Sequence, residues 1–458
     1  MTRLKKIFAN EKVSASAGSG KTFSLTTRFI ALACCANGSN FDPFSIIALT
    51  FTKKAAGEFL SKILIRLADA ASSPEEAKKL SYAIVDILPN ADKGFFLKTL
   101  RKLRMAHILP NSDIKNLDQE VFKKVLALCA KNVNRLHLST IDSLFSTIIK
   151  QNASSLKIFA PVKVEDENSN QAKRFMLDTV AKMMSSQTLT ERETSDFAEL
   201  IKRANFGKER KQLRETIVST LKLVHNVYLR NNDLSKWGQA NLSGIKFKLV
   251  EWNEDEYQQM LEQLQLQLED INEFSTIVKF FSSCGYAKLE TKTSSIVEKI
   301  LQHKRQGTLA KIESLPYRTK EIPFPCAELV DDMLDMLFSE HFLRLCEASY
   351  AVGKIASLYE AQYETNVRQQ GNITFSDMPF ILSDQERQIE KEIIEYKLDA
   401  KFKHWLFDEF QDTSQIQWDV LRNLAEEAII ANDKSFYYVG DVKQSIYAWR
   451  GATPKLFN

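Results

Sequence analysis

The stretch Ala15-Ser16-Ala17-Gly18-Ser19-Gly20-Lys21-Thr22 decides the fold, because it has the residues with which a backbone loop surrounds a chain of phosphates. Gly18 and Gly20 let the main chain turn its N–H groups toward one anion. Lys21 can reach the β- and γ-phosphates of a nucleotide, and Thr22 offers a hydroxyl to Mg²⁺. The stretch therefore predicts a phosphate-binding loop, in which Ala15 replaces the usual first glycine.

The residues on either side of this loop have the pattern of a strand and a helix. Lys12-Val13-Ser14 suits a short strand, and residues 23–35 have the apolar content of a packed helix, whose N-terminal dipole would face the anion. Residues 45–52 are typical of a buried parallel strand, and they run into polar residues at Thr52, Lys53 and Lys54. Polar residues at the carboxyl end of a strand predict the ligand-binding edge of an open α/β sheet.

Three more strands are predicted from similar runs, at residues 133–140, 404–407 and 435–439. A helix is expected from Ile141, and the two later strands run into polar loops. Ser414-Gln415-Ile416-Gln417 has the spacing of a capping box, which predicts a helix after Asp412. This alternation of strands and helices predicts an α/β fold with a doubly wound parallel sheet.

The middle of the chain has a different character. After Pro161 and the acidic run Glu165-Asp166-Glu167, about two hundred residues show helical periodicity and little strand signal, which predicts a large inserted all-helical subdomain. An apolar stripe at helical spacing predicts a packing face and not a binding site there: Tyr257, Met260, Leu264, Leu268 and Ile271. Pro316, Pro323 and Pro325 predict a loop.

Clusters of basic residues in this region have two interpretations, namely contacts with DNA or solvated helix faces. Solvated faces are favoured, because helical surfaces carry such charges routinely. The clusters are Lys202-Arg203, Lys208-Glu209-Arg210-Lys211 and His303-Lys304-Arg305.

Composition sets broad limits. The 458 residues are enough for about two to four domains, and no apolar run is long enough to predict a membrane span. The basic N-terminus, residues 1–6, has no export-signal pattern, which predicts a cytoplasmic protein. The six cysteines and six histidines are scattered without metal-ligand spacing and predict buried thiols and structural histidines. A net charge of +4 neither indicates nor excludes a nucleic-acid partner.

Asp408 and Glu409 follow a hydrophobic strand, as carboxylates do in the second half of a nucleoside triphosphate site. Asp408 can hold Mg²⁺ through water, and Glu409 can orient and deprotonate an attacking water. Taken alone, the pair is better explained as the acidic start of a helix. The phosphate-binding loop earlier in the chain reverses that preference.

Five ordered stretches resemble the motifs of superfamily 1 helicases of the UvrD/Rep type, nearest the RecB and AddA branch of recombination and repair. They are residues 15–22 (motif I), residues 49–56 (motif Ia), residues 139–143 (the Thr-x-x-Ser motif), residues 408–414 (motif II) and residues 440–452 (motif III). Residues 373–378 are similar to the short Asp-Phe-x-Asp-Leu element that this family places before motif II. The motifs cover the first core lobe of such enzymes, whereas the insertion matches by position only.

The resemblance implies a role for each motif residue. ATP would be held by the loop Ala15, Ser16, Ala17, Gly18, Ser19, Gly20, Lys21 and Thr22, and Mg²⁺ by Thr22 and Asp408. Glu409 would act on the attacking water, and Gln444 would sense the γ-phosphate. Single-stranded DNA would contact Phe51, Thr52, Thr140, Tyr447, Trp449 and Arg450.

Tyr447, Trp449 and Arg450 also favour DNA contact on physical grounds. Two aromatic rings beside a cation can stack bases, at ~1–3 kcal/mol per base. Without the motif, a buried aromatic pair would explain the two rings equally well, since aromatic side chains dominate protein cores.

Besides Ala15, the sequence departs from the pattern of this family at four places. No glutamine that could read adenine precedes the loop, Phe23 follows Thr22 where a basic residue is common, and Lys53 replaces an asparagine. Asp142 stands where many relatives have histidine, and an acid there would repel a DNA phosphate. We therefore expect Asp142 to cap its helix or to point away from DNA.

The sequence thus predicts an α/β P-loop NTPase of the RecA-like kind, with a core lobe at residues 1–155 and 371–458 and an inserted helical subdomain at residues 156–370. The resemblance implies an enzyme, the ATP-binding and DNA-contacting half of an ATP-dependent 3′–5′ DNA helicase or translocase. Its partners would be single-stranded or 3′-tailed DNA and a nuclease or helicase subunit, with no membrane.

Two alternatives remain open. One is a non-motor ATP-binding module that presents DNA to a partner, although the intact Lys21, Asp408, Glu409 and Gln444 argue against it. The other is a P-loop kinase or another small-molecule enzyme, against which residues 447–450 argue. Superfamily 1 motors place ATP between two lobes, and the arginines of the second lobe would lie after Asn458. We therefore expect that this sequence lacks the second lobe and that the 458 residues alone bind Mg-nucleotide weakly and hydrolyse it negligibly.

Overall fold

The structure of the chain is a computed structural model. It describes residues 10–14, 20–35, 43–87, 118–183, 221, 224–230, 233–239, 248–269, 274–283, 294–317, 320–384, 389–431, 433–445, 453 and 456. The chain divides into two compact units, and each is described by itself: Met1–Phe175 with Glu364–Asn458, and Met176–Tyr363.

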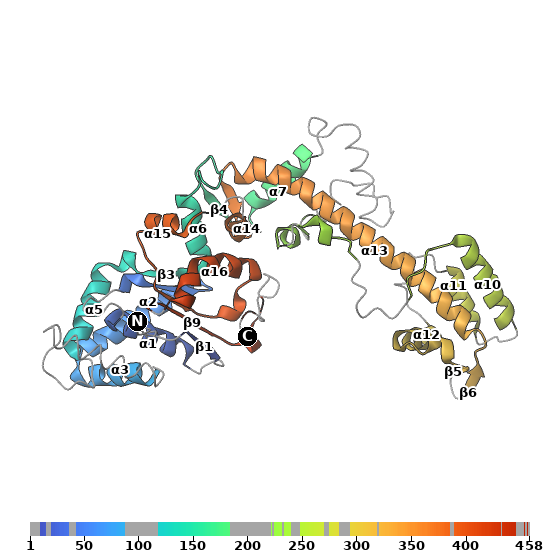
Figure 1. Ribbon diagram of the computed structural model, residues 1–458, viewed down its shortest axis with the longest axis horizontal. Helices are drawn as coiled ribbons and strands as arrows, with labels where there is room; N and C mark the ends of the chain where they lie inside the picture. The colour runs from blue at the N-terminus through green and yellow to red at the C-terminus, as the bar shows by residue number, and fades with distance from the viewer. Residues whose placement is uncertain are drawn as a thin grey trace, which may run out of the picture. The chain divides into compact units, whose positions relative to one another are not determined.

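Five parallel strands form the central sheet of the first unit, in the order β1-β9-β8-β2-β3 (Figure 1). Their bounds are β1 Glu11–Ser14, β2 Ile46–Thr50, β3 His137–Thr140, β8 His404–Phe407 and β9 Ser435–Gly440. All five lie within or beside the runs from which they were predicted. One run is shorter than expected, because Val133–Arg135 forms a 3-10 turn and the strand begins at His137.

Helices pack on both faces of this sheet. Strand residues alternate between two hydrophobic clusters, so that Ile46 and Ala48 join one and Ile47 and Leu49 join the other. The first cluster contains α1 Lys21–Cys35, α2 Lys53–Ser72, α3 Pro74–Ile87 and α5 Gln119–Lys131; the second contains α6 Ile141–Gln151, α14 Asp377–Ser383, α15 Lys391–Lys397 and α16 Gln415–Ile430. β2 and β8 are buried along their whole length, which explains why their sequences are mostly apolar. The predicted α/β class with a parallel sheet is confirmed.

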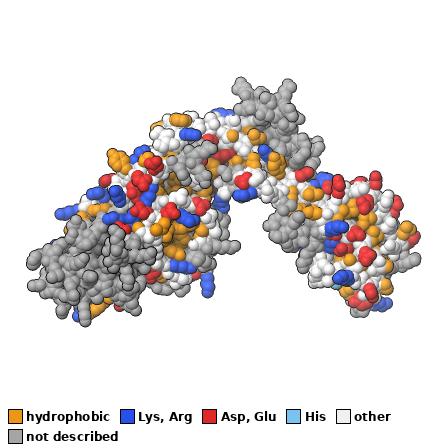
Figure 2. Space-filling model, viewed as in Figure 1, with side chains coloured by type: hydrophobic (Ala, Val, Ile, Leu, Met, Phe, Trp, Pro, Cys, Tyr) orange, Lys and Arg blue, Asp and Glu red, His pale blue; other side chains and the backbone are white. Residues whose placement is uncertain are grey.

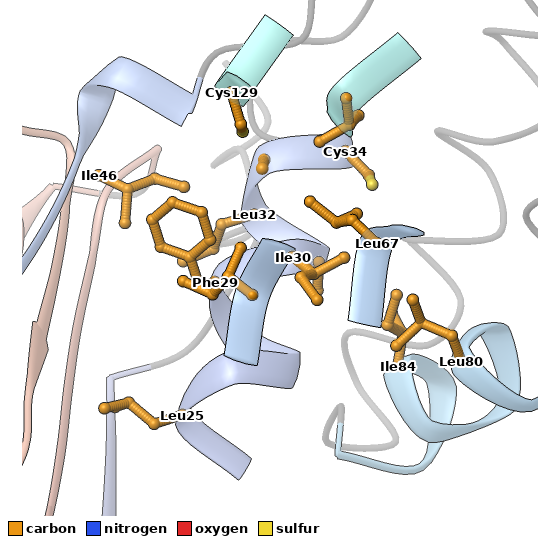
Figure 3. Packing of buried hydrophobic residues seen from close by; sticks show 14 of the residues in the cluster. Leu25, Phe29, Ile30, Leu32, Cys34, Ile46, Leu67, Leu80, Ile84 and Cys129 are labelled. Carbon is orange, nitrogen blue, oxygen red and sulfur yellow. The ribbon is translucent and has the colours of Figure 1, made fainter. Parts of the chain in front are cut away.

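The helix that begins at Lys21 is anchored by large apolar side chains. Phe29 lies toward Ile46 of β2, whereas Ile30 lies toward Leu67 of α2 and Ile84 of α3 (Figure 3). Each of these side chains is at most 1% exposed. This packing fixes the first turn of α1 at the carboxyl edge of the sheet.

The capping box predicted for α16 is present with both of its hydrogen bonds. Ser414 Oγ accepts from Gln417 N at 3.3 Å, and Ser414 N donates to Gln417 Oε1 at 3.0 Å. A capping box satisfies two backbone donors that the helix itself leaves without partners. It fixes the point at which the acidic loop after β8 enters α16.

A second, small sheet contradicts the all-helical character that was predicted for residues 156–370. β4 Lys163–Glu165 pairs in parallel with β7 Asn372–Thr374, and both belong to the first unit. Residues 163–165 were expected to be part of an all-helical region. The pairing explains the difference, since a three-residue strand gains its hydrogen bonds from a partner about two hundred residues away, which periodicity cannot reveal.

The second unit is mostly helical but not entirely so. Its helices include α10 Glu254–Leu268, α11 Ser275–Ser283, α12 Ser295–Gln306 and the long α13 Ala327–Tyr363, while α7 Asn170–Met183 spans the border between the units. The predicted packing face is confirmed for the described residues, because Tyr257, Leu264 and Leu268 are buried in α10. Met260 is partly buried, and Ile271 lies outside the described residues.

An antiparallel hairpin replaces part of the predicted proline loop. β5 Ser314–Tyr317 pairs with β6 Lys320–Pro323, so Pro316 and Pro323 lie in strands, whereas Pro325 lies in a turn as predicted. Proline is tolerated in a strand whose N–H side faces no partner, and both strands of a two-stranded hairpin have such an edge. The expectation of a wholly helical insertion was therefore wrong at this point.

Lys304 also contradicts its prediction, because its side chain is only 6% exposed and not part of a solvated face. Its Nζ lies 2.9 Å from Asp331 Oδ1 and 2.6 Å from Asp335 Oδ1. These carboxylates on α13 compensate the charge of a lysine on α12 that has been withdrawn from water. Lys202-Arg203 and residues 208–211 lie outside the described residues.

Two features of the surface bear on function. Acidic and basic side chains are intermixed on the face in Figure 2, where the described residues form no large field of one sign. No helix in the described part of the chain is long and apolar enough to cross a membrane.

The assignment of residues 156–370 as an inserted subdomain and of the remainder as a core lobe stays a prediction.

Candidate functional site

Polar residues gather where the parallel strands end. β8 runs into Asp408 and Glu409, β9 runs into Asp441, and Gly20 and Lys21 lie shortly after β1. Because all five strands are parallel, these ends share one edge of the sheet. Gly20 has a φ of 84°, a left-handed conformation that glycine adopts without steric cost.

Lys21 is the centre of the site. Its Nζ lies 2.9 Å from Glu409 Oε1 and 3.0 Å from Glu409 Oε2, and it donates to Gln444 Oε1 at 3.4 Å. The lysine side chain is 10% exposed and the glutamate side chain 33% exposed. The structure therefore brings together three residues that are more than thirty positions apart and that were each predicted for this site.

The backbone of Glu409 is in an unusual conformation, with a φ of 51° and a ψ of 45°. Non-glycine residues in this left-handed region cost of order 1–3 kcal/mol, and they cluster at functional sites. Two hydrogen bonds hold the turn, since Glu409 N donates to Asp408 Oδ1 at 3.1 Å and Asp412 N donates to Glu409 O at 3.0 Å. This turn directs the Glu409 carboxylate toward Lys21.

Sequence analysis missed two residues that complete a ring of hydrogen bonds. Gln411 Nε2 donates to Glu409 Oε2 at 2.7 Å, and Gln411 Oε1 accepts from Asp441 N at 3.0 Å. Asp441 Oδ2 in turn accepts from Gln444 Nε2 at 2.6 Å. With the Lys21 contacts to Glu409 and Gln444, these bonds close a five-residue ring: Lys21, Glu409, Gln411, Asp441 and Gln444.

The carboxylates of the site differ in their protonation behaviour. Burial, with a smaller contribution from the charge of Glu409, raises the pKa of Asp408 to about 6, and the same causes raise the pKa of Asp412 to about 6. Hydrogen bonds from Gln444 and from Lys443 N hold the pKa of Asp441 below its usual range. Asp408 is thus a carboxylate whose negative charge is poorly compensated by the protein.

The side chains of Asp408 and Thr22 offer oxygen atoms, the ligands that Mg²⁺ takes, and so fit the predicted magnesium site. A divalent cation would compensate the negative charge of Asp408, a carboxylate whose pKa is raised mainly by burial. The described residues contain no group of three or more His, Cys, Asp or Glu side chains arranged to hold a metal. Mg²⁺ is usually held by one or two carboxylates together with substrate phosphates and water.

Three residues predicted to contact DNA lie at the same edge of the sheet: Phe51, Thr52 and Thr140. Thr52 and Thr140 each cap a helix there. Thr52 is the N-cap of α2, where its hydroxyl accepts from Ala55 N at 3.1 Å. Thr140 is the N-cap of α6, accepts from Ser143 N at 3.1 Å and is 6% exposed. Thr52 is exposed and Phe51 is half-buried. DNA contact by these residues stays a prediction.

Asp142 does not cap its helix, because Thr140 has that position. It lies in the first turn of α6, where its Oδ1 accepts from Gln417 Nε2 at 3.3 Å. An acidic side chain is also favourable there, next to the positive end of the helix dipole. Loop residues 15–19 and the predicted DNA-contacting Tyr447, Trp449 and Arg450 lie outside the described residues.

A parallel α/β sheet whose carboxyl edge pairs a lysine with strand-end carboxylates belongs to the broad class of nucleotide-binding folds. The chain belongs to the UvrD/REP helicase N-terminal domain family, whose model matches residues 4–458. The resemblance found in the motifs is thereby confirmed.

Curated relatives include an ATP-dependent helicase/nuclease subunit of Clostridium perfringens, 23% identical over 98% of this chain, and the protein of the same name from Lactococcus lactis subsp. cremoris, 25% identical over 98%. Exonuclease/helicase subunit RexA of another strain of that subspecies is also 25% identical over 98% of the chain. These alignments cover 34% to 36% of the relatives. The chain thus spans about a third of the length of the relatives that it matches.

Proposed function

We propose that this chain is the ATP-binding and single-stranded-DNA-contacting part of an ATP-dependent 3′–5′ DNA helicase or translocase. Its fold would be that of a RecA-like P-loop NTPase, with the core lobe and inserted subdomain at the predicted boundaries. It would act in the cytoplasm on single-stranded or 3′-tailed DNA during recombination and double-strand-break repair. The relatives named as subunits support a partner subunit for this protein.

The contact between Lys21 and Glu409 is the observation that carries this proposal. The pairing of a lysine that follows a glycine-rich loop with the second carboxylate of motif II supports phosphate binding and water activation at the same site. A phosphate competes with Glu409 for the same ammonium group. We infer that nucleotide binding transfers Lys21 from Glu409 to the phosphates and leaves the Glu409 carboxylate able to accept a proton.

Each residue of the site has a separate task in this proposal. Lys21 and the loop backbone bind the phosphates, and Thr22 and Asp408 hold Mg²⁺, which neutralises phosphate charge when it is bound. Glu409 orients the attacking water and takes its proton at a carboxylate oxygen. Gln444 contacts Lys21 in this structure. In the proposal, Gln444 also contacts the γ-phosphate, so that a bound nucleotide changes the contacts of the segment after β9.

ATP turnover with and without single-stranded DNA tests the proposal in the complete protein that contains these residues. A helicase or translocase hydrolyses ATP faster when an oligo-dT strand is added, because DNA completes its working cycle. A non-motor module would bind ATP without DNA-stimulated turnover. A small-molecule kinase would hydrolyse or transfer phosphate independently of DNA, and either result would contradict the proposal.

Mg-nucleotide affinity is expected to fall in acid because of Asp408. A carboxyl group with a pKa of about 6 binds a proton in competition with Mg²⁺, so affinity should decrease about fourfold between about pH 7.5 and about pH 5.5. Calorimetry across this range measures the effect. Asp408→Asn should bind more weakly and lose this part of the pH dependence, whereas an identical profile in wild type and variant would exclude Asp408 as the titrating ligand.

Loss of Tyr447 or Trp449 is expected to weaken DNA binding. Substitution by Ala should reduce oligo-dT affinity by about fivefold or more, or ~1 kcal/mol, with little change in thermal stability, because a stacking surface is lost. Fluorescence anisotropy and thermal unfolding of the same variants measure both quantities. Trp405→Ala is the control, since Trp405 is a buried core residue and should show the reverse pattern. That reverse pattern in the Tyr447 and Trp449 variants would indicate a core role.

A further inference from the structure

We propose that Gln411 is a positioning residue, which orients the Glu409 carboxylate and connects it to the segment Asp441–Gln444. The inference rests on the proposed function, because it concerns how Glu409 acts on water. Neither the motif resemblance nor the sequence pattern gave Gln411 a role.

The contacts of Gln411 use both ends of its carboxamide. Its Nε2 donates to Glu409 Oε2 at 2.7 Å, and its Oε1 accepts from Asp441 N at 3.0 Å. Its side chain is buried, with the residue 1% exposed. Inside a protein, hydrogen bonds to a charged group are stronger than neutral ones and impose a direction on it. Gln411 therefore restricts the orientation of the carboxylate from the side of the protein interior.

Local structure places Gln411 between two strand ends. It is the middle residue of the 3-10 turn Phe410–Asp412, which Asp408 and Glu409 separate from β8, and Asp441 directly follows the neighbouring strand β9. A carboxamide offers both a donor and an acceptor at one side-chain end, as these two partners require. Glutamate of the same size keeps the acceptor and loses the donor, which makes the two contacts separable by mutation.

Gln411 becomes more important when Lys21 moves. Among the described residues, Lys21 and Gln411 are the side chains that the structure places on the Glu409 carboxylate. Once a phosphate takes Lys21, the bond from Gln411 holds the carboxylate in place. Gln411 also holds the backbone of Asp441, because its Oε1 accepts from Asp441 N. The Asp441 side chain in turn accepts a hydrogen bond from Gln444. Gln411 thus links the water-activating carboxylate to the residue that senses the γ-phosphate.

Gln411→Glu tests this role in the complete protein, with Gln415→Glu as the matched control. Gln415 is an exposed glutamine four residues away, whose Nε2 donates to Asp419 Oδ1 at 2.8 Å. For Gln411→Glu, we expect kcat for DNA-stimulated ATP hydrolysis to fall at least about tenfold, or ~1.4 kcal/mol, while Mg-ATP affinity changes by less than about threefold. The control should keep both values. An unchanged kcat in Gln411→Glu, with active wild-type protein, would overturn the inference.

The double variant Glu409→Gln with Gln411→Glu provides a readout that needs no turnover. The double variant exchanges the amide and the carboxylate between the two positions. The amide at position 409 can then donate a hydrogen bond to the carboxylate at position 411. Thermal unfolding should show a lowered midpoint for Gln411→Glu alone and recovery of most of that loss in the double variant. No recovery would contradict the contact, even if the single variant folds poorly. Wild-type protein that neither binds nor hydrolyses ATP would instead refute the proposed function.

Discussion

In the complete protein that contains these residues, Glu409→Gln is expected to reduce ATP hydrolysis by about 10²–10⁴-fold, the range that a general base contributes. The amide cannot take a proton from the attacking water, although it has nearly the same size as the carboxylate. Nucleotide binding should be retained or tightened, because the variant removes the carboxylate that competes with phosphate for Lys21. Steady-state turnover and calorimetric titration with a slowly hydrolysed analogue measure these two effects separately.

Glu426→Gln is the control for this variant, since Glu426 is an exposed residue on α16. It should keep wild-type turnover and affinity. If Glu409→Gln kept wild-type turnover, Glu409 would not be the base. If the variant lost nucleotide affinity along with turnover, the contact between Glu409 and Lys21 would stabilise the site and would not compete with phosphate binding.

Lys21→Ala is expected to lower Mg-ATP affinity by about tenfold to a hundredfold. The substitution removes a charge-assisted contact with phosphate, and hydrogen bonds to charged groups contribute about 1.5–3 kcal/mol. It also leaves the Glu409 carboxylate without its cation, which adds repulsion of the phosphates. Calorimetric titration with Mg-ATP measures the change.

Lys443→Ala is the matched control, because Lys443 is an exposed lysine in the turn that contains Gln444. It removes an equal charge from the same region without removing the contact with phosphate. Equal losses in the two lysine variants would show that net charge explains the affinity. Unchanged affinity in Lys21→Ala would refute the assignment of the phosphate-binding loop.

The strands of the central sheet were predictable because local sequence dictates them. Residues 46–50 and 404–407 are buried on both faces, so they read as short continuous apolar runs, with polar residues just beyond. The capping box at Ser414 and Gln417 was predictable for a similar reason, since all of its atoms lie within one helical turn. The predicted edge of the sheet followed from these local signals.

Features that depend on distant partners were not predictable. Lys304 looks like part of a solvated basic cluster, yet Asp331 and Asp335 on another helix compensate its charge within the protein. The hairpin that contains Pro316 and Pro323 gives no alternating apolar pattern, and its prolines indicated a loop. In both cases tertiary contacts override a correct statistical preference.

The ring of hydrogen bonds around Lys21 was predictable only in part. Motif resemblance assigned Lys21, Glu409 and Gln444 to one site, but not the direct pairing of Lys21 with Glu409. Gln411 was missed because its two bonds join strand ends that are thirty residues apart. The spacing Glu409-Phe410-Gln411 in a short turn after a buried strand is the signal that could have revealed it.

A crystal structure of the chain with Mg²⁺ and a slowly hydrolysed ATP analogue tests the central claim most directly. We expect Lys21 Nζ to contact a phosphate oxygen and no longer the Glu409 carboxylate, while Gln411 Nε2 keeps its bond to Glu409. Asp408 and Thr22 should lie on the Mg²⁺ side of the phosphates. An analogue bound elsewhere, with Lys21 still 2.9 Å from Glu409 Oε1 as in this structure, would contradict the account.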